Sequence, residues 1–278
     1  MGWLQAIVLG VVEGLTEFLP VSSTGHLTVA EKLMDLQVDD PGVTAFTAIV
    51  QVGAILAVIG YFWRDLVRLV VAFFRGLASA QARRDPSWRE ALVMIVGSIP
   101  VGIVGFLARD LISGPLRNLW VVAVALVAWC VVMVVAERRA RQQRGERSLT
   151  LTDAVVVGLT QCVALVPGVS RSGATISAGL LRGLDRVSAT RLSFLLSIPA
   201  LVAAGGFEAA TEGGAVADSV GWGPTVVATL VSLVVGYASI AWLLRLVANH
   251  PITVFVGYRV LAGVVLAVLL GTGVVAAT

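Results

Sequence analysis

The sequence predicts an all-α integral membrane protein with six transmembrane helices and two re-entrant helical hairpins arranged as an inverted-topology repeat. Hydrophobic residues make up 58% of the 278 residues, charged residues only 13%, and the mean hydropathy is +0.93. A soluble domain would have a charged fraction of about 25%. Six apolar stretches are long enough to cross a bilayer, and two short polar clusters interrupt the apolar sequence, each close to a proline.

At about 1.5 Å per residue, a helix needs roughly 20 residues to cross the hydrocarbon core. We expect the crossings at 43–63, 91–108, 119–136, 192–207, 222–244 and 252–275. The chain is then a single membrane domain over residues 1–278, with pseudo-repeat halves of about 1–136 and 137–278.

Arginines gather between these crossings, at 64–89, 138–147 and 182–191. Short loops rich in Lys and Arg stay in the cytoplasm, so these segments are predicted to lie inside. The acidic segment 208–221, with Glu208, Glu212 and Asp218, is predicted to lie outside. The net charge of +3 thus reflects topology, and we expect no nucleic-acid partner.

The apolar run from Asp153 to Val166 lies between two segments that are both predicted to be inside. A hairpin that enters, breaks at Pro167-Gly168 and returns over 174–182 satisfies both flanks. Thr150 and Asp153 offer a capping box for its first helix. Because segment 64–89 is predicted to lie inside, crossing 43–63 runs inward and the residues before it lie outside. Residues 1–20 and 24–36 then form a mirror hairpin that enters from outside. Non-helical backbone at this depth requires surrounding protein or a cavity.

Sequence similarity between the hairpins supports a repeat. Gly14-Leu-Thr-Glu17 resembles Gly158-Leu-Thr-Gln161, and Val21-Ser-Ser-Thr-Gly25 aligns with Val169-Ser-Arg-Ser-Gly173. Broken helices of opposite orientation that meet at mid-depth are typical of inverted repeats. A chance match of short strings is the alternative.

The first polar cluster contains Glu13 and Glu17, which lie on one face of a helix because they are four residues apart. Paired carboxylates favour a divalent cation or a shared proton, and oxygen ligands suit Mg²⁺ or Ca²⁺ better than zinc. The alternative is a pair of glutamates that reaches out to the membrane interface.

Hydroxyl groups follow the helix break in both clusters. A helix N-terminus presents free N–H groups and a partial positive charge, which favours phosphate. Arg171 adds a planar donor suited to phosphate oxygens, although a structural pair with Glu17 is the alternative for it. The hydroxyls concerned are those of Ser22, Ser23, Thr24, Ser170, Ser172 and Thr175. Helix capping is the alternative for one of the first three.

His26 completes the set, because its imidazole can act as nucleophile, base or acid. Such a group of side chains suits phosphoryl transfer, which depends mainly on positioning and charge neutralisation. A substrate that brings phosphates into a membrane is a lipid phosphate.

At these residues the sequence resembles the bacterial undecaprenyl-diphosphate phosphatases, also called bacitracin resistance proteins. The strings Glu13-Gly-Leu-Thr-Glu17-Phe-Leu-Pro-Val-Ser-Ser-Thr-Gly-His26 and Pro167-Gly-Val-Ser-Arg-Ser-Gly-Ala-Thr175 look like the two signatures of that family. The resemblance implies hydrolysis of undecaprenyl diphosphate to undecaprenyl phosphate and phosphate, which recycles the lipid carrier for cell-wall synthesis and gives bacitracin tolerance. It also implies a multi-pass protein of the plasma membrane, a divalent cation, and an active site facing the outer side.

By the same resemblance the functional core is Glu13, Glu17, Ser23, His26 and Arg171. Ser23 is the favoured nucleophile, activated by Glu17 or His26, while Arg171 holds the diphosphate. The remaining hydroxyls would line the phosphate pocket. The residues themselves leave open whether Ser23, His26 or water attacks.

Two other classes of function compete. Inverted repeats with broken helices also build transporters, so the chain could flip a lipid phosphate or move phosphate. A structural scaffold would leave the intramembrane charges unexplained. The preferred metal, the chain length of the lipid and the oligomeric state, a homodimer included, are left open by the sequence.

Overall fold

The computed structural model describes residues 1–38 and 40–277 as α-helices joined by short turns. The first helices are α1 (Trp3–Thr16), α2 (Ser23–Leu33), α3 (Pro41–Tyr61), α4 (Trp63–Ala78), α5 (Pro86–Leu107), α6 (Arg109–Ser113) and α7 (Leu119–Arg139). They are followed by α8 (Leu151–Val163), α9 (Arg171–Leu181), α10 (Arg186–Ser219), α11 (Trp222–Asn249) and α12 (Val254–Gly271). The predicted all-α class is confirmed.

Six of these helices, α3, α5, α7, α10, α11 and α12, are long and apolar enough to cross a membrane. They coincide with the six predicted crossings. The main difference is in α10, which continues as one helix to Ser219, beyond the predicted end at 207. Most of the predicted outer segment is therefore helical, and the side chains of Glu208, Glu212 and Asp218 lie outside the described residues.

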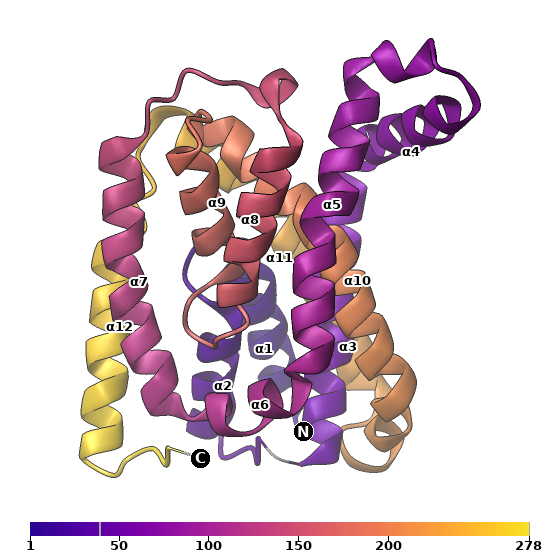
Figure 1. Cartoon of the computed structure of the whole chain (residues 1–278). Helices are drawn as coiled ribbons and strands as arrows, with labels where there is room; N and C mark the ends of the chain where they lie inside the picture. Colours follow the sequence, from indigo (N-terminus) through magenta and orange to yellow (C-terminus); the bar gives the residue numbers. More distant parts are fainter. Residues whose placement is uncertain (39, 278) are drawn as a thin grey trace.

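The helix pairs α1–α2 and α8–α9 are too short to cross and lie between the long helices (Figure 1). They approach from opposite ends of the bundle, and the turns that join their helices meet near its middle. Thr150 and Asp153 form the predicted capping box at the start of α8, with Thr150 N donating to Asp153 Oδ2 at 2.9 Å. Both breaks fall at the predicted prolines.

Each pair packs against a long helix from the other part of the chain, α1 against α11 and α8 against α5. Glycines allow this close approach. A Cβ atom on Gly14 would lie 2.6 Å from the Ser232 carbonyl oxygen, and one on Gly158 would lie 2.3 Å from the Gly97 carbonyl oxygen. Small residues at such contacts bring backbones together, as is common in membrane helices.

A buried aromatic group holds the first turn against α10. Phe18, in the break after α1, meets Phe194 edge-on with ring centroids 5.5 Å apart, and Phe62 lies 6.2 Å from Phe194 on another side. All three are almost fully buried. Phe18 thereby fixes the neighbouring Glu17 beside α10.

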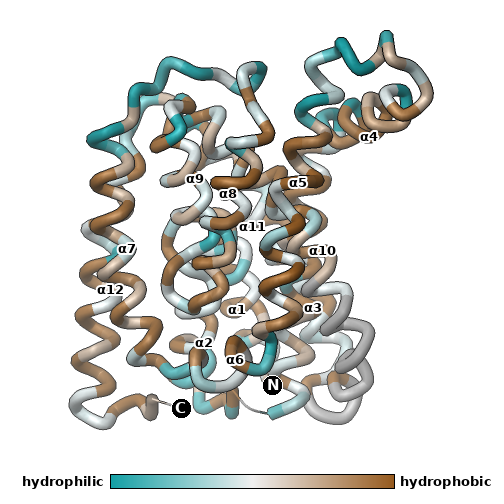
Figure 2. The backbone as a smooth tube through the Cα atoms, in the orientation of Figure 1, coloured by the Kyte–Doolittle hydropathy of each residue, from teal (hydrophilic) through white to brown (hydrophobic). Residues whose placement is uncertain are grey.

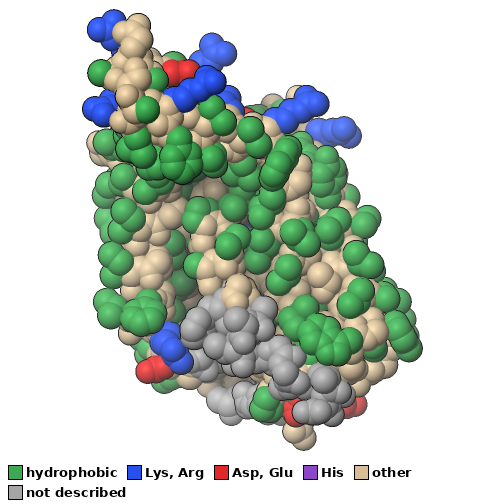
Figure 3. All heavy atoms as spheres, turned by 90° about the vertical axis from the view of Figure 1, so that its right-hand side faces the viewer, with side chains coloured by type: hydrophobic (Ala, Val, Ile, Leu, Met, Phe, Trp, Pro, Cys, Tyr) green, Lys and Arg blue, Asp and Glu red, His purple; other side chains and the backbone are tan. Residues whose placement is uncertain are grey.

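The arginine clusters gather at one end of the bundle, which we call the arginine-rich end. Figure 2 shows hydrophilic segments at this end and mainly hydrophobic helices below it. In Figure 3 a rim of basic side chains lies above a flank of hydrophobic ones, and these are arginines, since the chain's one lysine, Lys32, is at the end of α2. The sequence predicted only a loop at 64–90, yet Trp63–Ala78 forms α4, which extends sideways at this end (Figure 1).

Candidate active site

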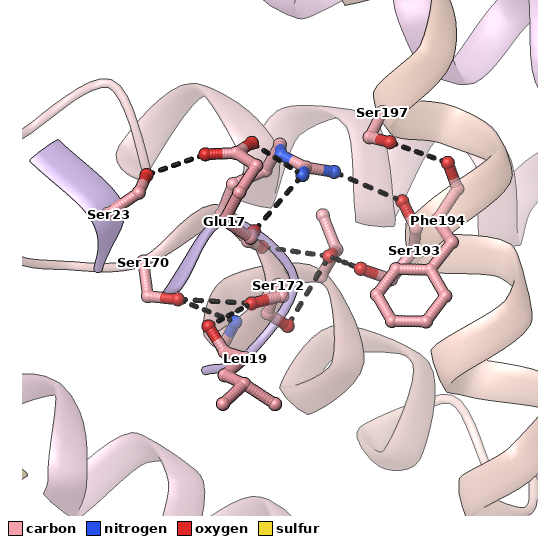
Figure 4. A network of polar contacts seen from close by, with 11 residues as sticks. Glu17, Leu19, Ser23, Ser170, Ser172, Ser193, Phe194 and Ser197 are labelled. Carbon is pink, nitrogen blue, oxygen red and sulfur yellow. Dashed lines mark hydrogen bonds and ion pairs between the residues drawn. The ribbon is translucent and has the colours of Figure 1, made fainter. Parts of the chain in front are cut away.

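Glu17 lies just after α1 and links the two helix pairs. Its Oε2 accepts a hydrogen bond from Ser23 Oγ at 2.6 Å, and its Oε1 accepts one from Arg171 Nη2 at 2.9 Å (Figure 4). The Glu17 residue is only 7% exposed. A buried carboxylate is costly unless it is paired and hydrogen-bonded, and here its two partners are a hydroxyl and a guanidinium from opposite helix pairs.

Arg171 is the first residue of α9 and keeps donor capacity beyond the ion pair. Its Nη2 also points at the Glu17 carbonyl at 3.4 Å, and its Nη1 at the Ser193 carbonyl at 3.5 Å, both long contacts. Its Nε is buried and has no hydrogen-bond partner. Since a buried unpaired donor is costly, this side of the guanidinium is suited to an anionic ligand.

The other hydroxyls of the second cluster bind mainly to protein. Ser172 Oγ donates to the Leu19 carbonyl at 2.9 Å and lies 3.2 Å from Ser170 Oγ. Thr175 Oγ1 donates to Ser193 Oγ at 2.6 Å. Figure 4 shows this layer beneath the Glu17 carboxylate. Ser172 and Thr175 thus join the second turn to the first turn and to α10.

Ser22 and Ser170 are the N-caps of α2 and α9 and share an unusual backbone, with φ of 77° and 75°. Ser170 caps its helix in the ordinary way, accepting from Gly173 N at 3.2 Å. Ser22 does not cap α2, because its Oγ accepts from Gly168 N of the other turn at 3.1 Å. The first N–H groups of α2 therefore lack a side-chain cap and are suited to an anion.

His26 lies one turn into α2 and faces α12. Its Nδ1 is 2.7 Å from the Ser22 carbonyl oxygen, which can only accept, so Nδ1 carries a proton. Its Nε2 lies 2.5 Å from the Tyr258 hydroxyl, and the two rings stack with centroids 5.6 Å apart. No hydrogen bond joins His26 to Ser23, the hydroxyl that the resemblance expected either Glu17 or His26 to activate.

Glu13, one turn before Glu17, is 1% exposed, and neither of its carboxylate oxygens has a hydrogen-bond partner. Gln161 on α8 has an equally unpartnered side-chain amide. Thr24 is exposed, and its carbonyl accepts from Thr28 Oγ1 at 2.9 Å. Among the predicted site residues, the side chains of Glu13 and Thr24 are therefore the two that form no hydrogen bond within the described part of the protein.

The donor set near Glu13 fits a hard cation. Among the described residues no group of three or more His, Cys, Asp or Glu side chains is arranged to hold a metal. Mg²⁺ is commonly held by one or two carboxylates together with substrate phosphates, so a full protein cage is not required. The unpartnered oxygens of Glu13 and the carboxylate of Glu17 satisfy that condition.

Sequence reasoning missed Arg259 on α12, which is fully buried. Its Nη1 donates to the Pro20 carbonyl at 2.8 Å, and its Nη2 to those of Gly168 and Val169 at 2.9 and 3.1 Å. Arg259 therefore holds both turns at once. The sequence could have indicated Arg259, because it lies inside the predicted crossing 252–275, and charged residues within membrane crossings usually have a functional role.

Comparison with known proteins identifies the family. The model of the bacitracin resistance protein BacA family matches residues 6–265. The chain is 52% identical to undecaprenyl-diphosphatase 3 of Frankia casuarinae, over the full length of both chains. It is 53% identical to the undecaprenyl-diphosphatase of Cutibacterium acnes, again over both full lengths, and 54% identical to that of Acidothermus cellulolyticus over 99% of each chain.

The chain belongs to the bacitracin resistance protein BacA family. The resemblance predicted from the two polar clusters is thus confirmed, and both clusters lie within the matched residues. In this BacA family member the two clusters come from helix pairs at opposite ends of the bundle and meet at Glu17.

Proposed function

We propose that the chain hydrolyses undecaprenyl diphosphate to undecaprenyl phosphate and inorganic phosphate, which returns the lipid carrier to cell-wall synthesis. The observation that supports this most directly is the bonding of Glu17 to both Ser23 and Arg171. We assign these three bonded side chains the roles of nucleophile for Ser23, base for Glu17 and phosphate-binding cation for Arg171. The names of the relatives at 52–54% identity agree.

In the proposed reaction Ser23 Oγ attacks the terminal phosphorus and gives its proton to Glu17, to which it is already bonded at 2.6 Å. The bond from that phosphorus to the bridging oxygen breaks, and undecaprenyl phosphate leaves with the proton that Glu17 passes to its phosphate oxygen, so Glu17 is again a carboxylate. Water then attacks the phosphoserine and gives its proton to Glu17. The bond between phosphorus and Ser23 Oγ breaks, Glu17 returns the proton to Oγ, and inorganic phosphate is released. The hydrogen bond that prepares Ser23 for this is the feature that favours it over water and over His26.

Arg171 and the start of α2 would bind the phosphate oxygens. Arg171 has the unpartnered Nε described above, and the helix start offers N–H groups from Ser23 and Thr24. Ser22, Ser170, Ser172 and Thr175 would support the pocket through the bonds that hold the two turns together. Glu13 and Glu17 would hold Mg²⁺ or Ca²⁺, which would neutralise charge on the diphosphate when bound.

We further propose that both helix pairs are re-entrant hairpins and that the halves, about 1–136 and 137–278, form an inverted repeat. The equivalent backbone of Ser22 and Ser170 supports this, since φ near +75° is rare for serine. So does the reciprocal packing of α1 on α11 and of α8 on α5. These matched contacts favour a repeat over a chance similarity of short strings.

In the proposed orientation the arginine-rich end faces the cytoplasm of a bacterial plasma membrane and the active site opens to the outer side. A membrane-impermeant thiol reagent tests this in intact cells. A cysteine at Asp35, near the end of α2, should react from outside, whereas one at Gln143 should react only after lysis. The reverse pattern would contradict the orientation.

The activity is tested by phosphate release from undecaprenyl diphosphate with detergent-purified protein, with and without EDTA. We expect metal-dependent release by the wild type and a loss of at least about 100-fold in Glu17→Gln, Ser23→Ala and Arg171→Ala, since a positioned base alone contributes about 10²–10⁴-fold. Ser98→Ala is the matched control, because the Ser98 hydroxyl donates to Met94 O of its own helix and, among the described residues, has no other hydrogen bond.

The outcomes distinguish the alternatives. Lost release in Ser23→Ala supports a phosphoserine, whereas retained release in that variant, with loss in Glu17→Gln, would mean that Glu17 activates water. No release by folded wild type that still binds the lipid would overturn the enzyme proposal and favour a flippase. Overexpression of an active enzyme should also raise bacitracin tolerance.

A further inference from the structure

Helix α4 has one face that is apolar and exposed. Trp63 is 60% exposed and Phe74 is 63% exposed, far more than is usual for large hydrophobic side chains in water. The exposed apolar side chains recur at helical spacing, so they form a single stripe. Its members are Trp63, Val67, Val70, Val71, Phe74 and Leu77.

The rest of the protein fixes the direction of this stripe. The opposite side of α4 is buried at Leu69, Ala72 and Gly76. Phe73 stacks on Trp88 of α5 with ring centroids 5.6 Å apart, and a Cβ on Gly76 would lie 2.1 Å from the Trp88 ring. The apolar stripe therefore points away from the protein contacts.

The size and place of α4 exclude a membrane crossing. Its 16 residues span about 24 Å, less than the roughly 30 Å hydrocarbon core. It extends sideways at the arginine-rich end, with arginine side chains above and hydrophobic ones below (Figures 1 and 3). A short helix with a strong apolar face and a basic edge is typical of the membrane interface.

Basic side chains beside the stripe are available to a ligand. Arg64 and Arg75 lie on one edge of α4, and Arg84 and Arg89 lie in the adjoining turn and at the start of α5; all are exposed. Within the described part of the chain, no hydrogen bond or ion pair involves these four side chains. Arg68 differs, because it is paired with Glu90 and Asp65.

We propose that α4 lies in the headgroup layer of an anionic leaflet, with its apolar stripe in the acyl-chain boundary and Arg64, Arg75, Arg84 and Arg89 bound to anionic phospholipid phosphates. The ion pair between Asp65 and Arg191, at 2.9 Å, ties α4 to α10. The helix thereby sets the depth of the bundle in the membrane. This proposal does not depend on the proposed function.

The depth of α4 is tested with the full chain in nanodiscs of phosphatidylcholine, with or without phosphatidylglycerol. Spin labels at Phe74→Cys and, as a control, Gln81→Cys are compared in a background without Cys130 and Cys162. We expect oxygen to relax the label at 74 and a nickel chelate to relax the label at 81. Equal access of the nickel chelate to both labels would overturn the proposal.

The charge preference is tested by native mass spectrometry of phosphatidylglycerol binding to the full chain. Each basic residue near an anionic surface contributes about fivefold in affinity. The variant with Arg64, Arg75, Arg84 and Arg89 changed to Gln should therefore lose at least about fivefold in affinity. The matched control changes four exposed arginines at the end of α7 and in the segment after it, Arg138, Arg139, Arg141 and Arg147, to Gln.

We expect little loss in the control. Equal losses in the two variants would show that the arginine-rich end attracts anionic lipids as a whole, and would overturn the role of α4. Thermal unfolding in detergent reports whether both variants are folded.

Discussion

Replacing Arg259 with Met tests whether this buried arginine holds the active site together. Arg259 donates to the carbonyls of Pro20, Gly168 and Val169 at 2.8–3.1 Å, and through Nε to that of Leu126 at 3.2 Å. Methionine fills a similar volume and adapts to irregular space, but it donates no hydrogen bond. The substitution therefore removes the shared donor of both turns without opening a large cavity.

The expected cost follows from these bonds. A buried carbonyl left without a donor costs about 1–3 kcal/mol, so four of them give about 4–12 kcal/mol before compensation. Removing a buried cation returns several kcal/mol of desolvation energy. We expect a net loss of about 3 kcal/mol in the free energy of unfolding, and a loss of about 100-fold in kcat/KM, because misplacing reacting groups by about 1 Å has that effect.

The assay combines thermal unfolding in detergent with phosphate release below the unfolding transition. Arg259→Lys, which keeps the charge but loses the planar fork, should be intermediate. Arg245→Met, at an exposed arginine of α11, should match the wild type. A folded Arg259→Met variant with wild-type melting temperature and wild-type kcat/KM would refute the reasoning; lower stability with normal kcat/KM would restrict Arg259 to a structural role.

Three further outcomes are expected. Gly158→Ala should lower the melting temperature by several degrees, because a Cβ would lie 2.3 Å from a backbone oxygen of α5. Gly102→Ala is the control and should leave the melting temperature unchanged, because a Cβ there would have no atom within 4 Å. Equal effects of the two substitutions would contradict the packing argument. Tyr258→Phe removes the hydroxyl beside His26 Nε2. It should reduce kcat about tenfold or less, the effect of one lost hydrogen bond. A shift in the acidic or basic limb of the pH–rate profile would assign this loss to His26. Glu13→Gln should raise the Mg²⁺ concentration needed for half-maximal release, and an unchanged metal requirement would remove Glu13 from the cation site.

The sequence was most informative where physical constraints were local. Six long apolar runs predicted six helices with similar limits, because bilayer thickness restricts helix length. Thr150 and Asp153 predicted a helix start that the structure confirms, since a capping box depends on neighbouring residues only. Helix α4 was missed because its arginines suggested a loop, although its apolar residues recur at helical spacing.

The candidate site was predictable in its composition but less so in its pairing. Glu17, Ser23 and Arg171 were all named, and the contact of Glu17 with Arg171 was weighed as a structural alternative. The partner of His26 could not be found in the same way, because Tyr258 comes from a helix far along the chain and tertiary packing alone brings it there. Serine hydroxyls were also ambiguous, since Ser22 and Ser170 cap differently despite matching backbones.

The reciprocal packing of α1 on α11 and of α8 on α5 has a consequence for biosynthesis. Helix α1 leaves the ribosome well before α11, the helix against which it packs most extensively, so α1 lacks its main partner until α11 has been made. Arg259, which holds both turns, is made later still. A nascent chain therefore carries Glu17 for 154 residues before its ionic partner Arg171 is made, and the two turns gain their shared donor only when Arg259 has been inserted.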